Sequence, residues 1–183
     1  VMMITFNHLP DLFKGDELAI NIGSNCQFTS NVSQLTWLPD RPYTVGGWGF
    51  VNGTNRSTTS EIHNTIDGPI YQTWLEDITE YKIDASVGTY EVELLMADIS
   101  RPARQQANLL GKGDERTSSA SNRFNITICG KVVEQNFSPA DNNRYLNACR
   151  RRYIVHNDDG CIDICLTPIQ GKTILSGIKV RRL

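Results

Sequence analysis

The residues best suited to chemistry in this chain lie in the segment WLPDRPYTVGGWGF, which begins at Trp37. Its rings, among them Tyr43 and Trp48, each combine an apolar face with a polar edge. Such rings suit stacking on the C–H face of a pyranose, while Asp40 and Arg41 beside them offer hydrogen bonds to its hydroxyls. The residue types and their spacing therefore predict a sugar-binding platform.

A purely structural role is the alternative for several residues of this segment. Trp37 and Phe50 can plug the end of a β-sandwich, and Gly46 and Gly47 can simply form a turn. We favour the structural role for Trp37. For Trp48 the two roles have equal support, because glycines on both sides would let a ligand approach the backbone closely.

Carboxylate pairs raise the question of catalysis, since glycoside hydrolysis needs two carboxylates about 5 to 9.5 Å apart, one with a raised pKa. The chain has adjacent carboxylates in polar surroundings, where a solvated surface or a turn is the usual explanation. These pairs are Glu76-Asp77, Asp114-Glu115 and Asp158-Asp159. No nucleophile elbow or phosphate-binding loop is present either. We therefore predict no catalytic residue in this chain.

Metal and cofactor sites lack support from ligand spacing. The five cysteines contain no CxxC pattern, and the three histidines are far apart in sequence. Cys161 and Cys165 would lie about 13 Å apart along a strand, too far for a mutual disulfide. Oxygen ligands for a structural Ca²⁺ could come from Asp67, Asp98, Asp141 and Asn142. No calcium-loop spacing connects them, so we predict neither a metal nor a cofactor.

The charge pattern excludes two further classes of partner. The net charge is -2, and the 18 Lys and Arg are scattered apart from Arg150–Arg152 and the pair at 181–182. No basic stripe indicates nucleic-acid binding. No apolar run approaches the roughly 18 residues that a membrane-spanning helix needs.

The elements that must position these residues are strands, because apolar residues alternate with polar ones. In 90–96 the apolar positions of one face are Tyr90, Val92, Leu94 and Met96, and Glu91 and Glu93 separate the first three of them. The same period recurs in 124–128, 162–166 and 174–180, with glycine- or proline-containing turns between. This pattern predicts an all-β fold, an antiparallel jelly-roll β-sandwich. The aromatic stretch 31–60 and the polar stretch 101–122 interrupt it and are predicted to form binding loops.

Six segments, taken in order, resemble the malectin and malectin-like carbohydrate-binding modules. They include AINIGS, WLPDRPYTVGGWGF, PIYQT and GTYEVELLMA, and they lie at 19–24, 37–50, 69–73, 88–97, 124–131 and 174–180. The resemblance implies a galactose-binding-like sandwich over residues 16–183, with 1–15 as a linker or edge segment from a preceding domain. The second segment is similar to the form appended to family 2 glycoside hydrolases, mainly bacterial β-galactosidase-like enzymes.

The resemblance also implies a site and a role. Trp48 falls where the family has a tyrosine before a glycine, and Tyr71 falls on the tyrosine of its Tyr-Gln-Thr motif, whereas Ile99 and Ser100 replace its aromatic pair. Its late aspartate falls near Lys172 or Thr173. Trp48 and Tyr71 are thus expected to form a stacking surface in one groove. Trp48→Ala is expected to weaken binding about tenfold, with little change in melting temperature.

The expected function is that of a non-catalytic accessory module. It would hold a β-galactosidase-like parent enzyme, whose catalytic domain lies in the same polypeptide, on a galactoside- or glucoside-containing glycan. The alternative is a structural domain that packs against the catalytic barrel without binding sugar. Because glycan substrates lie outside the cytoplasm, the expected location is periplasmic, cell-surface or secreted.

Overall fold

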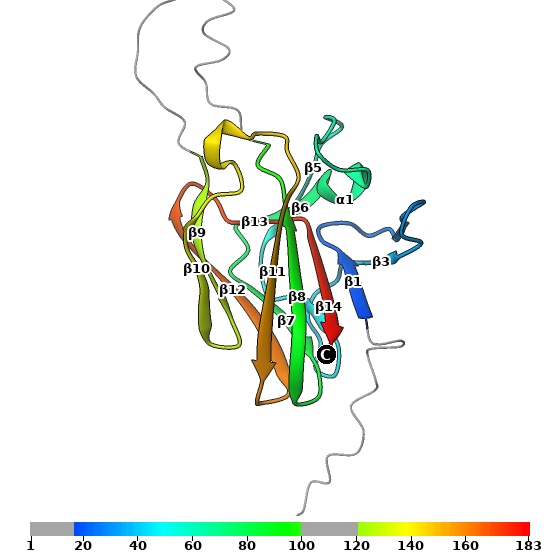
Figure 1. Ribbon diagram of the computed structural model, residues 1–183, viewed down its shortest axis with the longest axis vertical. Coiled ribbons are helices and arrows are strands. Elements are labelled where there is room, and N and C mark those ends of the chain that lie inside the picture. Colours follow the sequence, from blue (N-terminus) through cyan, green and yellow to red (C-terminus); the bar gives the residue numbers. More distant parts are fainter. Residues whose placement is uncertain (1–16, 100–120) are drawn as a thin grey trace, which may run out of the picture.

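The computed structural model describes residues 17–99 and 121–183 (Figure 1). The segment predicted as a linker, residues 1–15, and nearly all of the polar stretch 101–122 lie outside the described residues. Those two predictions therefore remain predictions.

A six-stranded sheet forms one layer of the molecule. In spatial order its strands are β11 (Cys149–Asn157), β8 (Gly88–Met96), β14 (Gly177–Arg182), β1 (Glu17–Asn21), β3 (Thr36–Pro39) and β2 (Phe28–Thr29). The long central pairs β11–β8 and β8–β14 are antiparallel (Figure 1).

A five-stranded sheet forms the second layer, and a small sheet adjoins the end of the molecule that carries α1 (Figure 1). The five-stranded sheet has the order β10 (Lys131–Phe137), β9 (Arg123–Ile128), β12 (Cys161–Gln170), β7 (Glu80–Asp84) and β4 (Trp48–Phe50). The small sheet has the order β13 (Ile174–Leu175), β6 (Thr73–Glu76) and β5 (Thr54–Ser57). In the described residues the helices are α1 (Gly68–Tyr71) and a 3-10 turn, η1 (Asp141–Asn143). The predicted all-β sandwich is confirmed.

The main core fills the space between the two larger sheets. Ten of the residues predicted to face inward from the alternation are at most 1% exposed. They are Tyr90, Val92, Leu94, Met96, Phe124, Ile126, Ile128, Ile162, Ile164 and Leu166. Period-two patterning therefore identified this core correctly.

The structure differs from the expected wholly antiparallel arrangement at one place. β1 and β3 pair in parallel, with Ile20 opposite Leu38 and Asn21 opposite Pro39. The backbone N–H of Asp40 donates to the Ser24 carbonyl at 2.7 Å, which holds the ends of the two strands together. The stretch 31–60, expected to form loops, also contains the short strands β3, β4 and β5.

A second apolar cluster lies on the outer face of the six-stranded sheet, where α1 covers it. Leu95 of β8 faces this cluster, opposite to its neighbour Leu94. Trp37 is 4% exposed here, which confirms its predicted structural role, although it packs under α1 rather than at the end of the sandwich. Tyr71, at the end of α1, is 1% exposed.

Beyond this cluster the same outer face carries cross-strand ion pairs. Glu93 of β8 is 1% exposed and lies 2.9 Å from Arg150, 3.2 Å from Arg152 and 3.6 Å from Lys179. These three cations come from β11 and β14, the two neighbours of β8 in the sheet. A buried carboxylate needs such partners, because burial of an unpaired charge is costly.

Candidate functional site

The structure separates the five sequence-predicted site residues into two places. Asp40, Arg41, Tyr43 and Trp48 lie in or beside β4, at the edge of the five-stranded sheet. Tyr71 belongs to the outer cluster and lines a pocket to which none of the other four contributes. The pocket beside Tyr71 is therefore not lined by the ring of Trp48.

The Asp40 carboxylate is hydrogen bonded within the protein. It accepts hydrogen bonds from the backbone N–H of Gly23 at 2.9 Å, from its neighbour Arg41 at 2.8 Å and from the hydroxyl of Tyr81 at 2.8 Å. Burial raises the pKa of Asp40, and these hydrogen bonds partly oppose the shift. Its contacts are those of a residue that fixes the turn after β1.

The ring of Trp48 is covered by Arg41. The guanidinium carbon lies 3.6 Å from the ring centroid, and Arg41 Nε donates to the Trp48 carbonyl at 3.2 Å. The indole packs against the main core, and its N–H is buried without a hydrogen-bond partner among the described residues. A sugar could stack on the covered face only if Arg41 moved away.

Tyr43 is held in a similar way at the adjoining loop. Its hydroxyl donates to Asp84 at 3.0 Å, and the Asp84 carboxylate also accepts the backbone N–H of Gly46. Burial and the hydrogen-bonded carboxylate raise the pKa of Tyr43 to about 12, so its hydroxyl stays protonated. The contact with Asp84 anchors the glycine-containing loop to β7.

A pocket of about 650 Å³ lies beside Tyr71, formed by three segments that are distant in sequence. Val32 and Ser33 come from the loop between β2 and β3, and residues 64–67 precede α1. Ala148 and Arg150, at the start of β11, complete the wall. The volume falls in the range of roughly 300–1,000 Å³ typical of small-molecule sites.

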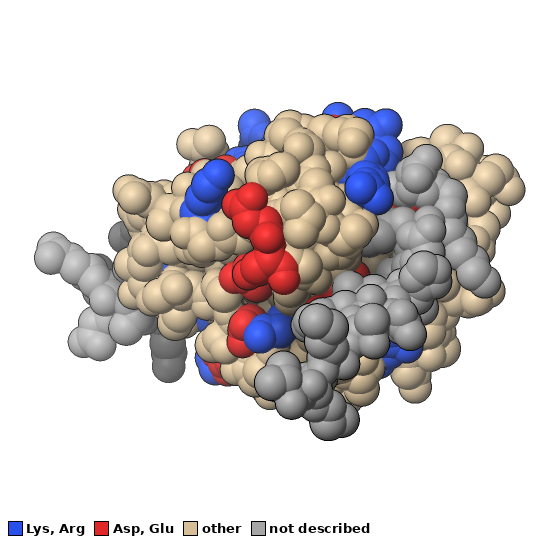
Figure 2. Space-filling view, turned by 90° about the horizontal axis from the view of Figure 1, so that it is seen from below, with Lys and Arg blue, Asp and Glu red and all other residues tan. Residues whose placement is uncertain are grey.

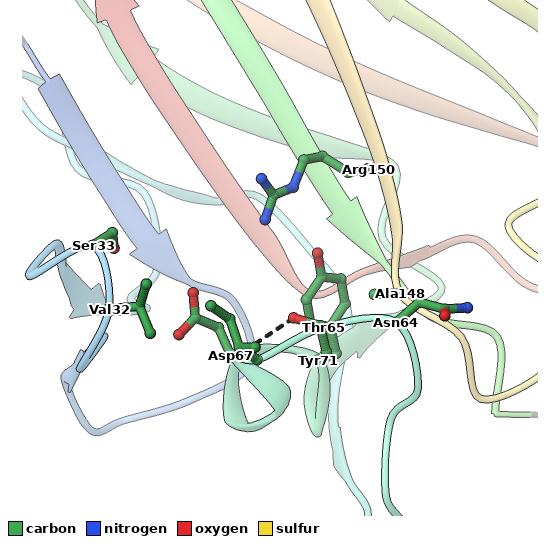
Figure 3. Close-up of a pocket in the computed structure, with 9 residues that line it drawn as sticks. Val32, Ser33, Asn64, Thr65, Asp67, Tyr71, Ala148 and Arg150 are labelled. Atoms are coloured by element: carbon green, nitrogen blue, oxygen red, sulfur yellow. Dashed lines mark hydrogen bonds between the residues drawn. The ribbon is translucent and has the colours of Figure 1, made fainter.

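The polar centre of this pocket is the pair Tyr71 and Arg150, whose side chains point toward one another (Figure 3). Burial raises the pKa of Tyr71, and the positive charge of Arg150 partly opposes the shift. Asp67 adds a carboxylate to the wall, and its backbone N–H donates to the Thr65 hydroxyl at 3.0 Å. Donors and acceptors therefore converge on a space open to solvent.

This arrangement suits a ligand rich in hydroxyl groups. Arg150 donates through several N–H groups, Tyr71 both donates and accepts, and Asp67 accepts. Tyr71 is buried as a whole, so it offers no stacking face to the pocket, and its hydroxyl points toward Arg150 (Figure 3). Sequence reasoning selected Tyr71 but missed Arg150 as a site residue, and it considered Asp67 only as a metal ligand.

The described residues also bear on metal ligands, cysteine pairing and membrane spans. In 17–99 and 121–183, no group of three or more His, Cys, Asp or Glu is arranged to hold a metal ion. Cys161 and Cys165, both in β12, are free thiols, as are the other three cysteines, of which Cys26 is exposed. Within the same ranges no helix is long and apolar enough to cross a membrane.

Comparison with protein families identifies the family to which this chain belongs. The family model of the malectin domain matches residues 17–180. The chain therefore belongs to the malectin-domain family, as the resemblance indicated. A search of curated proteins returned no match.

Solved structures add two kinds of relative. The β-glucuronidase of Bacteroides uniformis is 42% identical with a TM-score of 0.80, over 93% of this chain and 18% of that one. The plant receptor-like kinase FER is 13% identical with a TM-score of 0.65, over 91% of this chain and 42% of that one. The ectodomain of ANX2 from Arabidopsis thaliana is also 13% identical, with a TM-score of 0.64, over 91% of this chain and 42% of that one. The plant proteins share the fold, whereas the bacterial enzyme contains a domain with closely similar sequence.

Proposed function

We propose that this chain is a non-catalytic carbohydrate-binding accessory domain that holds a glycoside hydrolase on its glycan. The observation that carries the proposal is the open pocket in which Tyr71, Arg150 and Asp67 converge. Its mixture of donors and acceptors is suited to the hydroxyl groups of a sugar.

The enzyme comparison supports a catalytic domain in the same polypeptide as the partner. The chain spans 18% of the length of the β-glucuronidase that it resembles. A parent of this kind acts on glycans, for which a periplasmic, cell-surface or secreted location is expected. The bacterial relative is a β-glucuronidase, whereas the sequence motifs pointed to a β-galactosidase-like parent, so the sugar of the parent enzyme is left to experiment.

A structural domain that packs against the catalytic barrel is the second candidate, and one observation favours it. Val32 and Ile66, which line the pocket, are 70% and 74% exposed. Exposed apolar side chains of this size can mark a contact with another domain. In that case a neighbouring domain would cover the pocket.

Calorimetric titration of the 183-residue chain with galactosides, glucosides and plant polysaccharides tests the proposal. We expect at least one class of glycan to bind, and Asp67→Ala to weaken that binding about tenfold by removing a hydrogen-bond acceptor to the sugar. Asp158→Ala is the control, because that exposed carboxylate lies outside the pocket. If no glycan bound at millimolar concentrations, the proposal would fail and the structural candidate would replace it.

A further inference from the structure

A second cavity adjoins the pocket described above. It encloses about 390 Å³ and shares Ala148 and Arg150 with the first pocket as a common wall. Its other walls come from the stretch around η1, including Ser138 and Asn142, and from Arg151 of β11. The two cavities together offer a binding surface longer than one pocket provides.

We infer that these two adjacent cavities bind one oligosaccharide that carries anionic groups, carboxylate or sulfate, with Arg150 between them as the anion-binding residue. The inference rests on the proposed function and specifies its ligand class. It predicts a ligand that spans several sugar units.

Arg150 has free donor capacity toward the cavities. Its Nε lies 2.9 Å from a Glu93 carboxylate oxygen, and its guanidinium points toward the Tyr71 hydroxyl (Figure 3). A guanidinium carries five N–H donors in a planar fork, which leaves further donors for a ligand oxygen. Such a fork binds carboxylate and other oxyanions through paired hydrogen bonds.

Glu93 does not fully neutralise the positive charge of Arg150. That buried carboxylate also lies within 3.6 Å of both Arg152 and Lys179, which line neither cavity. Arg152 also pairs with Glu91, as does Arg181, and Lys179 also pairs with Glu17. The network thus holds four cations and three carboxylates. One positive charge is therefore left over in this network, and Asp67 on the wall of the first pocket is the carboxylate nearest in influence to Arg150 there.

The second cavity adds further positive charge. Arg144 lines it and makes no ion pair within the described part of the chain. Asp141 on the same wall is paired with Arg123 at 3.0 Å, and Arg151 lies 3.6 Å from Glu134. Arg144 is thus an exposed cation available to a second anionic group.

The opposite end of the molecule has the reverse character. Figure 2, viewed from that end, shows a band of acidic side chains. Four carboxylates line a cavity of about 450 Å³ there, around the turn between β11 and β12: Glu80, Asp158, Asp159 and Asp163. An acidic glycan would be repelled from this surface and favoured at the two arginine-lined cavities.

The test is calorimetric titration of the 183-residue chain with three probes. They are an oligogalacturonate, the same oligomer with every carboxylate methyl-esterified, and a sulfated galactan oligosaccharide. At low salt we expect the oligogalacturonate, the sulfated oligosaccharide or both to bind about tenfold tighter than the neutral ester, because a charge-assisted hydrogen bond is stronger than a neutral one. The comparison of the carboxylated and sulfated probes identifies the anion, and raising the ionic strength should reduce the preference.

Three variants locate the effect. Arg150→Gln should abolish the preference for the charged probe, and Arg144→Gln should reduce it several-fold without affecting folding, since that side chain is exposed. Arg181→Gln is the matched control, because this arginine pairs with Glu91 on the same sheet but lines neither cavity. Thermal melting of each variant checks that the fold is retained.

The outcomes separate the inference from the proposed function. Equal binding of the charged and neutral probes would overturn the inference and leave the proposed function intact. An unchanged affinity in Arg144→Gln, with a loss in Arg150→Gln, would overturn the extension into the second cavity. If neither these probes nor any neutral glycan bound, the proposed function would fail as well.

Discussion

At the scale of single residues, Asp40 shows that a polar side chain beside aromatic rings can serve the fold. Its carboxylate accepts hydrogen bonds from Gly23, Arg41 and Tyr81. We expect Asp40→Asn to lower the free energy of unfolding by about 1–3 kcal/mol, because the amide group cannot accept all of these bonds. Urea denaturation of both proteins measures the difference.

The same pair of proteins should show a defined pH dependence. The raised pKa of Asp40 means that the folded state disfavours the ionised carboxylate. Its contribution to stability is therefore complete below the ordinary aspartate pKa of about 4 and is lost as the pH rises through the raised value. The stability advantage over Asp40→Asn should narrow with rising pH in that window. An advantage that widened would contradict this assignment.

Trp48 and Arg41 allow the two roles of the aromatic segment to be separated. Trp48→Ala should lower the free energy of unfolding by about 2 kcal/mol or more, since the indole packs against the main core. The small change in melting temperature expected from sequence thus gives way to a clear decrease. Thermal denaturation followed by circular dichroism measures it.

Arg41→Ala is the companion variant. Removing this exposed cation from the ring should cost only about 0.5–1 kcal/mol. If Trp48 also stacks on sugar, uncovering its face should tighten glycan binding. Unchanged binding in Arg41→Ala would assign Trp48 to the fold alone.

Gly23 and Gly130 form a matched pair for backbone strain. Both have positive φ, +74° and +69°, but a Cβ at Gly23 would lie 2.5 Å from the Trp74 carbonyl oxygen, whereas one at Gly130 meets nothing within 4 Å. Gly130→Ala should cost about 1–2 kcal/mol from the left-handed conformation alone. Gly23→Ala should cost clearly more. Equal losses in chemical denaturation would contradict the close approach at Gly23.

At the scale of elements, the ion pairs across β11, β8 and β14 centre on Glu93. Glu93→Gln should lower the free energy of unfolding by about 1–3 kcal/mol, because three cations lose their shared buried anion. Glu17→Gln is the control: this carboxylate also pairs with Lys179, at 3.3 Å, but it is exposed enough that the loss should stay below about 1 kcal/mol. Similar losses in both variants, measured by guanidinium denaturation, would show that burial of Glu93 adds nothing.

The strands themselves could be predicted because each has one face in the main core. Period-two alternation marks such strands, as it did for Tyr90 to Met96. It missed that Leu95 is also buried, because the cover for that side comes from α1, a distant part of the chain. The sequence Asp67-Gly68-Pro69 indicated only a turn, where the structure begins a four-residue helix.

The site was predicted only in part, for a reason that concerns register. A motif match identified Tyr71 but could not show that the residue would be buried, with its hydroxyl directed toward Arg150. Arg150 reaches the pocket because β11 pairs with β8 so that it lies opposite Leu95. Local sequence patterns do not contain this pairing, so Arg150 could not be assigned from them.

At the scale of the whole molecule, the extent of the folded unit is testable. The family match begins at residue 17, as does β1. We expect deletion of residues 1–15 to leave the melting temperature of the chain and its glycan titrations unchanged. As a control, deletion through residue 21 removes β1 and should prevent cooperative unfolding. A large loss of stability in the first deletion would show that 1–15 belongs to the domain.

The pairing of β1 with β14 determines how this domain would respond to mechanical force. Glu17 lies opposite Arg181, so the chain enters and leaves the domain side by side, at the Gly88 end of β8, whereas Arg150 lies near its Met96 end. Tension between the entry and exit points would open the β1–β14 hydrogen bonds one after another, as in a zipper. A force between a glycan bound in the pocket and the chain ends would instead act along the length of the strands and load many hydrogen bonds at once. The same domain would thus unfold at low force when it is pulled between its two ends. It would resist a higher force when the pull acts between its ends and a bound glycan.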